Sequence, residues 1–326
     1  MTYTDISVVV CTYNRAEILR RALESLMVQE TGGEFSYEIL VIDDASSDET
    51  SSVVSEASSR SRVSIRYLRE EGHGIAQARN RGIENSSGKW VAFFDDDQLA
   101  APEWLKELHV LAVKTGASCV GGSRLLCLPE TDSPRLSPVC RALLGEIKCG
   151  DRPDKCGRKT DLATGNMLVK RDVFQAVGVF DEATTRGGED IEFTARLRKA
   201  GFEAWYAPRA VVHHLIPPYR LKEDYLLWLS LRVGDNFAYR DYRERGLAKT
   251  ELACVARIGQ LLLVNLPLLA WAYLMRNLAE VLGRRCLLWR ALGYTRRALN
   301  LLAPGLFPQD HFFADLEFRK ERAAFK

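Results

Sequence analysis

Residues 1–220 alternate between short apolar runs and amphipathic segments. Largely apolar runs at 6–11, 38–42, 63–68 and 90–94 have the composition of buried strands. Segments whose apolar residues recur every three or four positions separate them, most clearly at 16–29. A strand followed by a helix, repeated several times, predicts a doubly wound α/β sheet.

Weaker signals continue this pattern to about residue 220. Asn14 is expected to cap the first helix, because its side chain can accept a hydrogen bond from the first helical turn. Residues 127–160 predict a long loop with a short helix. The other expected elements are a helix after Pro102, strands at 118–122, 202–206 and 210–213, a turn entering a strand at 163–170, a helix at 171–177 closed by Gly178, and a turn at 187–190 that leads into a helix through Leu197.

After Tyr219 the pattern becomes helical. Residues 225–233 are apolar on one side, and residues 258–275 hold no charged residue in 18 positions, a borderline length for a spanning helix. A basic stretch with the single acid Glu280 follows, and its arginines are Arg276, Arg284, Arg285, Arg290, Arg296 and Arg297. An apolar helix with a basic flank predicts association with an anionic membrane surface. The alternative is a helix packed against protein, with a solvated basic face.

Composition narrows the functional classes only slightly. The chain has 326 residues, 47% of them hydrophobic, and a net charge of +2, so it lacks the strongly basic character of many nucleic-acid-binding proteins. Its eight cysteines lack the paired spacing of a zinc site and indicate a reduced compartment. The first ten residues have neither a basic start nor a long apolar run, so we expect no signal peptide.

Two predicted strands end in consecutive acidic residues. Asp43 and Asp44 follow the run at 38–42, and Asp95, Asp96 and Asp97 follow the run at 90–94. Adjacent carboxylates repel one another unless water, hydrogen bonds or a cation separates them, and a hard divalent cation suits oxygen ligands. The carboxyl ends of strands are also where open α/β sheets bind ligands. A solvated acidic turn is the alternative interpretation.

Six motifs, in order, resemble family 2 glycosyltransferases. They are VVVCTYNR, VIDDASSDET, GIAQARNRGI, FFDDD, TGNMLVKRDVF and GGEDIEF. The resemblance covers about residues 5–220 and implies an α/β GT-A fold, a Rossmann-like mixed sheet flanked by helices. We therefore expect a catalytic domain at 1–220 and a C-terminal helical, membrane-associating region at 221–326.

The resemblance implies a nucleotide-diphosphate sugar donor, typically a uridine diphosphate (UDP) sugar. Asp44 would accept a hydrogen bond from the uracil ring, with Asp43 either beside it or acting as a turn former. Arg79 would lie near the diphosphate, and the alternative is an exposed helix cation. The full set of implied donor-binding residues is Thr12, Tyr13, Asn14, Arg15, Asp43, Asp44, Arg79, Asp95 and Asp96.

The same resemblance matches residues 95–97 to an Asp-X-Asp motif that binds Mn²⁺ or Mg²⁺. Asp97 is the first choice as direct ligand, while Asp95 or Asp96 would reach the ribose or a metal-bound water, with Asp95 also a candidate ligand. His214, or else His213, would be a further metal ligand or diphosphate contact, and the alternative is a structural histidine. The cation would neutralise the departing diphosphate. Arg220 is a weaker candidate for a diphosphate contact.

For the transfer step, the resemblance implies that Asp190 is the catalytic base. It would remove a proton from the acceptor hydroxyl in a single inverting displacement. Glu189 would orient acceptor or donor, although acids at a helix N-terminus are also favourable without any catalytic role. Gly165 and Asn166 would form the wall of the acceptor and sugar pocket.

Three other functions fit the sequence less well than a glycosyltransferase does. A nucleotidyltransferase usually has a Gly-rich phosphate loop near its N-terminus, where this chain reads CTYNRAE. A non-catalytic scaffold would be favoured by loss of Asp97 or Asp190, and both are present. A processive synthase is disfavoured because no Gln-X-X-Arg-Trp motif follows Asp190. We therefore expect an enzyme of polysaccharide or cell-envelope glycan synthesis, acting on a saccharide or lipid-linked acceptor at the cytoplasmic face of a membrane, with no nucleic-acid partner.

Overall fold

The computed structural model describes residues 4–72, 74–130, 135–157, 162–182 and 188–308. The chain forms two compact units. The first, here called the sheet unit, takes the chain up to Cys127 and then Ile147–Leu215. The second, the helical unit, takes Leu128–Glu146 and the chain from Ile216 onward.

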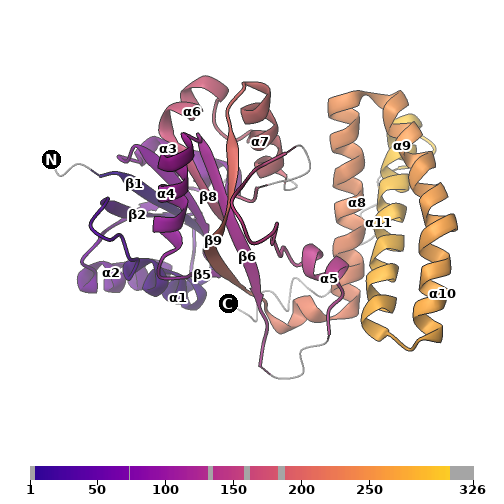
Figure 1. The fold of residues 1–326 in the computed structure, drawn as a ribbon, viewed down its shortest axis with the longest axis horizontal. Coiled ribbons are helices and arrows are strands. Elements are labelled where there is room, and N and C mark those ends of the chain that lie inside the picture. Colours follow the sequence, from indigo (N-terminus) through magenta and orange to yellow (C-terminus); the bar gives the residue numbers. More distant parts are fainter. Residues whose placement is uncertain (1–3, 73, 131–134, 158–161, 183–187, 309–326) are drawn as a thin grey trace. The chain divides into compact units, whose positions relative to one another are not determined.

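The sheet unit is built on one mixed sheet (Figure 1). Its order is β3-β2-β1-β4-β8-β6-β9-β5, with β7 also paired to β9. The strands are β1 Ile6–Thr12, β2 Tyr37–Asp43, β3 Ser64–Arg69, β4 Trp90–Asp95, β5 Gln98–Ala100, β6 Cys119–Cys127, β7 Asp154–Lys155, β8 Asn166–Lys170 and β9 Ala204–Leu215.

The N-terminal half of this sheet is parallel and the other half is mixed. β1 lies between β2 and β4 and is parallel to both. β8 is antiparallel to both of its neighbours, β4 and β6. Parallel pairing places the carboxyl ends of β1, β2 and β4 together, so their terminal polar residues meet at one edge.

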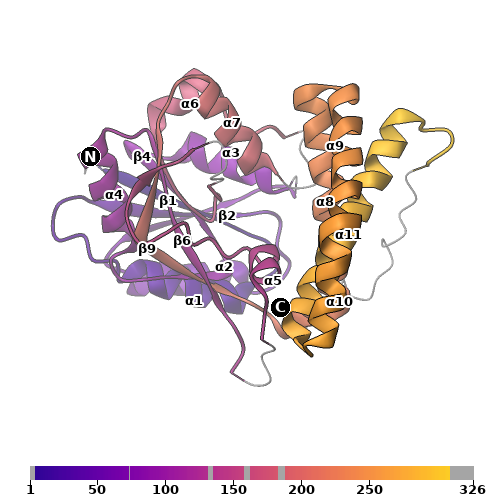
Figure 2. The same ribbon diagram turned by 45° about the vertical axis from the view of Figure 1, so that its right-hand side comes forward.

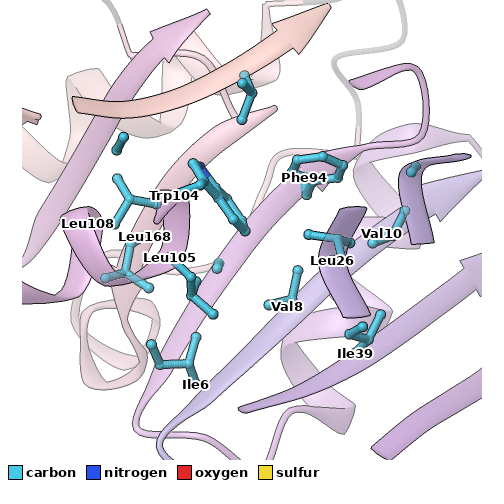
Figure 3. Close-up of a cluster of buried hydrophobic side chains, with 14 of the residues drawn as sticks. Ile6, Val8, Val10, Leu26, Ile39, Phe94, Trp104, Leu105, Leu108 and Leu168 are labelled. Carbon is cyan, nitrogen blue, oxygen red and sulfur yellow. The ribbon is translucent and has the colours of Figure 1, made fainter. Parts of the chain in front are cut away.

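Helices cover both faces of the sheet, because alternate residues of each central strand point to opposite faces. Val8 and Val10 of β1 and Phe94 of β4 belong to one core, packed with Trp104 and Leu26 (Figure 3). Val9 and Phe93 belong to the core on the other face, with Phe180 and Phe193. The helices of this unit are α1 Ala16–Met27, α2 Thr50–Arg60, α3 Ile75–Asn85, α4 Trp104–Thr115, α6 Arg171–Val177 and α7 Glu189–Lys199.

The helical unit is organised around two long helices, α8 and α11, which run side by side in Figures 1 and 2. They approach closely at two glycines. A Cβ at Gly234 would lie 2.0 Å from the carbonyl oxygen of Arg290, and one at Gly293 would lie 2.1 Å from that of Leu231. The elements of this unit are α5 Pro138–Leu143, the 3₁₀ turn η1 Pro218–Leu221, α8 Glu223–Arg245, α9 Leu247–Gln260, the π turn η2 Leu261–Asn265, α10 Leu266–Leu274 and α11 Leu278–Leu302.

The predicted α/β mixed sheet with a C-terminal helical extension is confirmed, with differences in detail. The two strands expected at 202–206 and 210–213 form one strand, β9. β9 pairs with β6, and the register of this pairing shifts between Gly122 and Ser123. The three-residue strand β5 was not predicted. The predicted apolar helix at 258–275 is the end of α9 followed by η2 and α10, and Pro267 explains the local π turn because it lacks a backbone donor. The predicted turn residue Gly187 lies outside the described residues.

Candidate functional site

The carboxyl ends of β1, β2 and β4 bring the predicted donor-binding residues to one edge of the sheet. Thr12 is in register with Asp43, and Cys11 with Asp95. Tyr13, directly after β1, is 53% exposed, so its ring is accessible for stacking. The acids that were far apart in sequence therefore share one edge.

Asp96 is the buried acid of the triplet and ties this edge together. Thr12 Oγ1 donates a hydrogen bond to Asp96 Oδ2 (2.8 Å), and Arg15 Nη1 donates one to Asp96 Oδ1 (2.7 Å). The same Arg15 nitrogen lies 3.3 Å from Asp97 Oδ2. Burial raises the pKa of Asp96 to about 6, opposed by Arg15 and reinforced by the charge of Asp97. Asp96 thus fixes the loop after β1 rather than facing solvent.

The prediction that Asn14 caps the following helix is wrong. Arg15 occupies the N-cap position of α1 and makes no capping hydrogen bond with its side chain. Asn14, one residue earlier, has a left-handed backbone (φ 51°). That conformation turns the Asn14 amide toward the neighbouring loop, where its Oδ1 accepts from the Ser47 backbone N–H at 2.8 Å. Asp48 of that loop accepts from the Ala16 N–H instead. Asn14 therefore joins the two loops that follow β1 and β2.

Asp43 and Asp44 have different surroundings. Asp43 is fully buried; its Oδ1 accepts from the Ser46 N–H, and its Oδ2 accepts from the Tyr67 hydroxyl at 2.5 Å. Asp43 thereby forms the turn, the alternative considered from the sequence. Asp44 is only partly buried and accepts from the Gly74 N–H at 3.1 Å, directly before α3.

Arg79 of α3 is buried and links two parts of the site. Its Nη1 donates to Glu189 Oε1 (2.5 Å), and its Nη2 lies 3.3 Å from Asp95 Oδ1. Burial opposes the charged form, but the carboxylates of Asp95 and Glu189 outweigh it and raise the pKa of the guanidinium. The alternative of an exposed helix cation is wrong, since Arg79 is 6% exposed.

Asp190 lies in the first turn of α7, next to this network. Its Oδ1 accepts from the backbone N–H of Ile191 (2.8 Å). Burial raises the pKa of Asp190 to about 6, with a further contribution from the charge of Glu189, while Arg79 acts in the opposite direction. A carboxylate with this pKa is a stronger base than an ordinary aspartate and is still mostly ionised at neutral pH.

Gly165 is required by Asp95. A Cβ at this position would lie 2.1 Å from Asp95 Oδ2. Two other residues contact the same oxygen: Gln98 Nε2 at 3.3 Å and Arg124 Nη1 at 3.9 Å. Sequence reasoning missed Gln98 and Arg124. Gln98 directly follows the acidic triplet, but the unpredicted strand β5 is what turns it back toward Asp95.

The Asn166 side chain lies in the core. Its Oδ1 accepts from Trp104 Nε1 (2.7 Å), and its Nδ2 donates to the carbonyls of Ser123 and Ala210. These contacts tie β8 to β6 and β9. The Asn166 side chain, which was predicted to form the pocket wall, therefore joins these strands in the core instead.

Asp97 and His214 form the pair from which a metal site could be built. His214 Nε2 lies 3.6 Å from Asp97 Oδ2, and His214 is 7% exposed. His213 is exposed, because successive residues of β9 point to opposite sides. Among the described residues, no group of three or more His, Cys, Asp and Glu side chains lies close enough to hold a metal ion. Arg220 belongs to η1 in the helical unit.

A parallel half-sheet with acids at its carboxyl edge, continued by antiparallel strands, is the arrangement of an α/β protein of the GT-A fold. The solved structure of GalNAc-T7 with UDP, GalNAc and Mn²⁺ has a similar fold: the TM-score is 0.54 at 19% identity, over 71% of this chain and 48% of that one. At this identity the likeness bears on the fold alone. The family model described as glycosyl transferase family 2 matches residues 7–178, so the chain belongs to that family.

Relatives of this chain include named glycosyltransferases and a polysaccharide biosynthesis protein. Glycosyltransferase AglE of Haloferax volcanii is 29% identical over 72% of this chain and 73% of its own length. Succinoglycan biosynthesis protein ExoM of Rhizobium meliloti is 28% identical, over 70% and 71%. Validoxylamine A glucosyltransferase of Streptomyces hygroscopicus subsp. jinggangensis is 33% identical over 60% of this chain, which spans only 52% of that enzyme. The predicted family and the prediction of a glycosyltransferase are confirmed.

Proposed function

We propose that this glycosyltransferase moves a sugar from a nucleotide diphosphate, of the UDP class, to a hydroxyl of a saccharide or lipid-linked acceptor. The product would be a polysaccharide or a cell-envelope glycan. The names of relatives support this range, which includes succinoglycan biosynthesis, chondroitin synthase and a glucosyl-dolichyl phosphate glucuronosyltransferase. The UDP and Mn²⁺ in the GalNAc-T7 crystal support the donor class.

The observation that carries the proposal is the bridge made by Arg79. It contacts Asp95 at the end of β4 and Glu189 at the start of α7. A buried arginine between two carboxylates holds them at fixed positions. The predicted donor side is thereby linked to the first turn of α7, which also carries the predicted base, Asp190. This contact also argues for a positioning role for Arg79, in place of a direct contact with the diphosphate.

The donor would lie along the carboxyl edge of β1, β2 and β4. Tyr13 offers an exposed ring for stacking on the base, and Asp44 offers a partly exposed carboxylate for its N–H group. Asp95, held by Gln98 and Arg79, is the candidate for the ribose hydroxyls. Thr12, Asn14, Arg15, Asp43 and Asp96 would act indirectly, by fixing the loops that carry these groups.

The residues present fit a divalent cation. Asp97 and His214 supply an oxygen and a nitrogen 3.6 Å apart, and Asp95 is a further carboxylate on the same edge. Such ligands suit Mn²⁺, and phosphate oxygens of a bound donor complete a site of this kind. When bound, the cation would offset the negative charge that develops on the departing diphosphate.

Asp190 is the proposed base. Its carboxylate takes the proton of the acceptor hydroxyl as that oxygen forms a bond to the anomeric carbon. The bond from this carbon to the diphosphate oxygen breaks, and its electron pair leaves with the nucleoside diphosphate. One displacement inverts the anomeric centre. Glu189 Oε2 is buried and makes no hydrogen bond within the described part of the chain, so it is available to orient a sugar hydroxyl.

The helical unit would hold the enzyme at the cytoplasmic face of a membrane. Of the helices within the described ranges, Leu247–Leu274 is the one long and apolar enough to cross a bilayer by length and composition, and 11% of its most apolar window is buried. An apolar helix this exposed, with basic residues after it, supports peripheral membrane association.

Asp190→Asn tests the proposed reaction. The amide keeps the size of the side chain but cannot take the proton, so we expect turnover to fall by about 10²–10⁴. Affinity for UDP should stay within a few-fold, because Asp190 is assigned to the acceptor side. Asp172→Asn, on an exposed acid of α6, is the matched control. Normal turnover by the Asp190 variant would remove this residue from the base role, and product with a retained anomeric centre would reject single displacement.

A further inference from the structure

The outer surface of α9 and α10 is apolar and exposed over several turns. Leu263 is 80% exposed, and Leu252 and Leu274 are each 70% exposed. The surface continues onto the start of α11, where Leu278 is 78% exposed. Its other members, all from 37% to 67% exposed, are Val255, Ile258, Leu262, Val264, Leu266, Leu268, Trp271, Tyr273 and Met275. An apolar surface of this extent marks a binding face.

The inner side of the same helices is tied to α8 and α11 by polar contacts. Arg257 of α9 lies over the ring of Tyr294 (4.3 Å) and 3.9 Å from Asp241. Tyr294 donates to Asp241 at 2.8 Å. Further along, Arg284 of α11 donates to Asn265 at 3.2 Å. The polar residues of α11 thus lie directly beside the apolar helix.

These contacts decide how the apolar helix can meet a bilayer. The 28-residue helix is long enough to cross one, since about 20 residues suffice. Because α8 and α11 pack beside it, a crossing would carry Arg284 of α11 and the pair of Arg257 with Asp241 of α8 into the hydrocarbon. Charged groups at that depth are strongly disfavoured. Spanning would therefore require the packed hairpin of α10 and α11 to open.

The charges around the surface suit an anionic partner. Four of the eight basic side chains in residues 247–302 pair with acids of α8 and α11. The exposed cations Lys249 and Arg276 lie before and after the apolar stretch. A long apolar face with exposed cations at both ends is the pattern of a helix that lies in the headgroup region of an anionic membrane. A second copy of this chain would bring these like charges together.

We infer that α9 and α10 lie in the plane of an anionic membrane surface, embedded through their outer apolar face, and that they do not cross the bilayer. This inference rests on the membrane association proposed above and specifies its topology. The turn at Arg276–Asn277 then stays on the same side of the membrane as the rest of the chain.

Binding to vesicles is the first part of the test. The full chain is mixed with preformed vesicles of phosphatidylcholine and phosphatidylglycerol, with pure phosphatidylcholine as the uncharged comparison. We expect co-sedimentation that requires the anionic lipid, and a loss of about tenfold or more for Leu263→Glu, because burial of one leucine is worth at least that factor. Val113→Glu changes an exposed apolar residue of α4 (64% exposed) and should leave binding within about twofold.

The topology is the second part. A site-specific protease's recognition sequence, flanked by Gly-Ser, is inserted between Arg276 and Asn277, where an exposed turn tolerates it. Protease added outside the vesicles should cut the bound chain as readily as the free chain. Cleavage only by protease trapped inside the vesicles would overturn the in-plane topology while leaving membrane association intact.

Two further outcomes would overturn the inference differently. If the wild-type chain binds no vesicles and forms a dimer that Leu263→Glu dissociates, the apolar face is an interface between two copies. If it neither binds vesicles nor dimerises, the proposed membrane association fails as well. Binding of UDP, measured on the same preparations, reports separately on the sugar-transfer proposal.

Discussion

The two units of this chain treat charge and apolar surface in opposite ways. In the sheet unit, charged side chains lie inside: Asp43, Arg79, Asp96 and Glu189 are each less than 8% exposed. In the helical unit, large apolar side chains lie outside, with Leu263 80% exposed. Both arrangements are costly for an isolated soluble protein, since buried charges lose water and exposed leucines gain it.

The difference shows where each unit meets a partner. The buried charges are paired, so the free energy lost by removing them from water is partly recovered in short hydrogen bonds that also fix positions. The exposed leucines have no such compensation within the described ranges, and it must come from a surface that covers them.

The largest effect is expected from Arg79→Gln. Loss of the cation leaves the buried Glu189 and the partly exposed Asp95 without their shared partner, which costs about 3–5 kcal/mol of stability. Transfer should fall by at least about 100-fold, because the two sides of the site lose their common link. Chemical denaturation and steady-state kinetics measure both. Arg81→Gln, at a half-exposed residue of the same helix (47% exposed side chain), should stay within about 0.5 kcal/mol. Equal stability and equal activity of the two variants would show that the buried contacts of Arg79 contribute to neither.

Gly165→Ala should have the next largest effect. The added Cβ would lie 2.1 Å from Asp95 Oδ2, so the carboxylate must move away from Gln98. We expect UDP affinity to fall by about tenfold, in line with an overpacking cost of about 1–3 kcal/mol. Gly157→Ala is the matched control, because a Cβ there meets nothing within 4 Å. Unchanged UDP affinity in the Gly165 variant would separate Asp95 from donor binding.

The pH dependence of transfer should follow Asp190. Its pKa of about 6 means that the base form is lost as pH falls below this value, so kcat should drop by about tenfold per pH unit there and level off above it. Arg79→Lys keeps the positive charge, so the fall of kcat at low pH should remain in this variant. A rate that does not change between about pH 5 and about pH 8 would contradict the assignment of Asp190 as base.

A smaller effect concerns the stability of the Asp190→Asn variant, which should rise although its activity falls. The pKa of Asp190 is raised in the folded state, so ionising it costs stability; the cost is fully present above about pH 6 and absent below the unfolded pKa of about 4. Asp190→Asn should therefore be more stable than the wild type by about 1–3 kcal/mol at neutral pH. Thermal unfolding at several pH values measures this gain. A variant equally stabilised at about pH 4 would owe its gain to something other than this ionisation.

Much of the sheet unit could be predicted because its strands and acidic ends are local signals. The run WVAFF and the acids after it indicated both β4 and the site edge. What a single sequence could not give were effects of distant segments. Asparagine is a common helix-capping residue, but the left-handed backbone of Asn14 directs its side chain to the loop of Ser47. The position of Gln98 depends on the pairing of β5 with β9, which places Gln98 in register with His214.

The helical unit was harder to interpret from its sequence, because its key signal depends on contacts with distant segments. The apolar stretch at 258–275 was clear, yet its meaning depends on which side chains pack beside it. The contact between Arg284 and Asn265 joins residues 19 positions apart on antiparallel helices. Hydropathy alone carries no such information. The choice between a spanning and an in-plane helix therefore needed the structure.

Calorimetric titration of the folded chain with UDP, first with Mn²⁺ and then with a chelator, tests the proposed donor site. We expect binding that requires the cation and that Asp97→Asn weakens by at least about tenfold, as expected for a lost ligand. Asp172→Asn should bind as the wild type does. Absence of UDP binding in folded protein, or binding indifferent to both the chelator and Asp97→Asn, would contradict a metal-assisted donor site at this edge of the sheet.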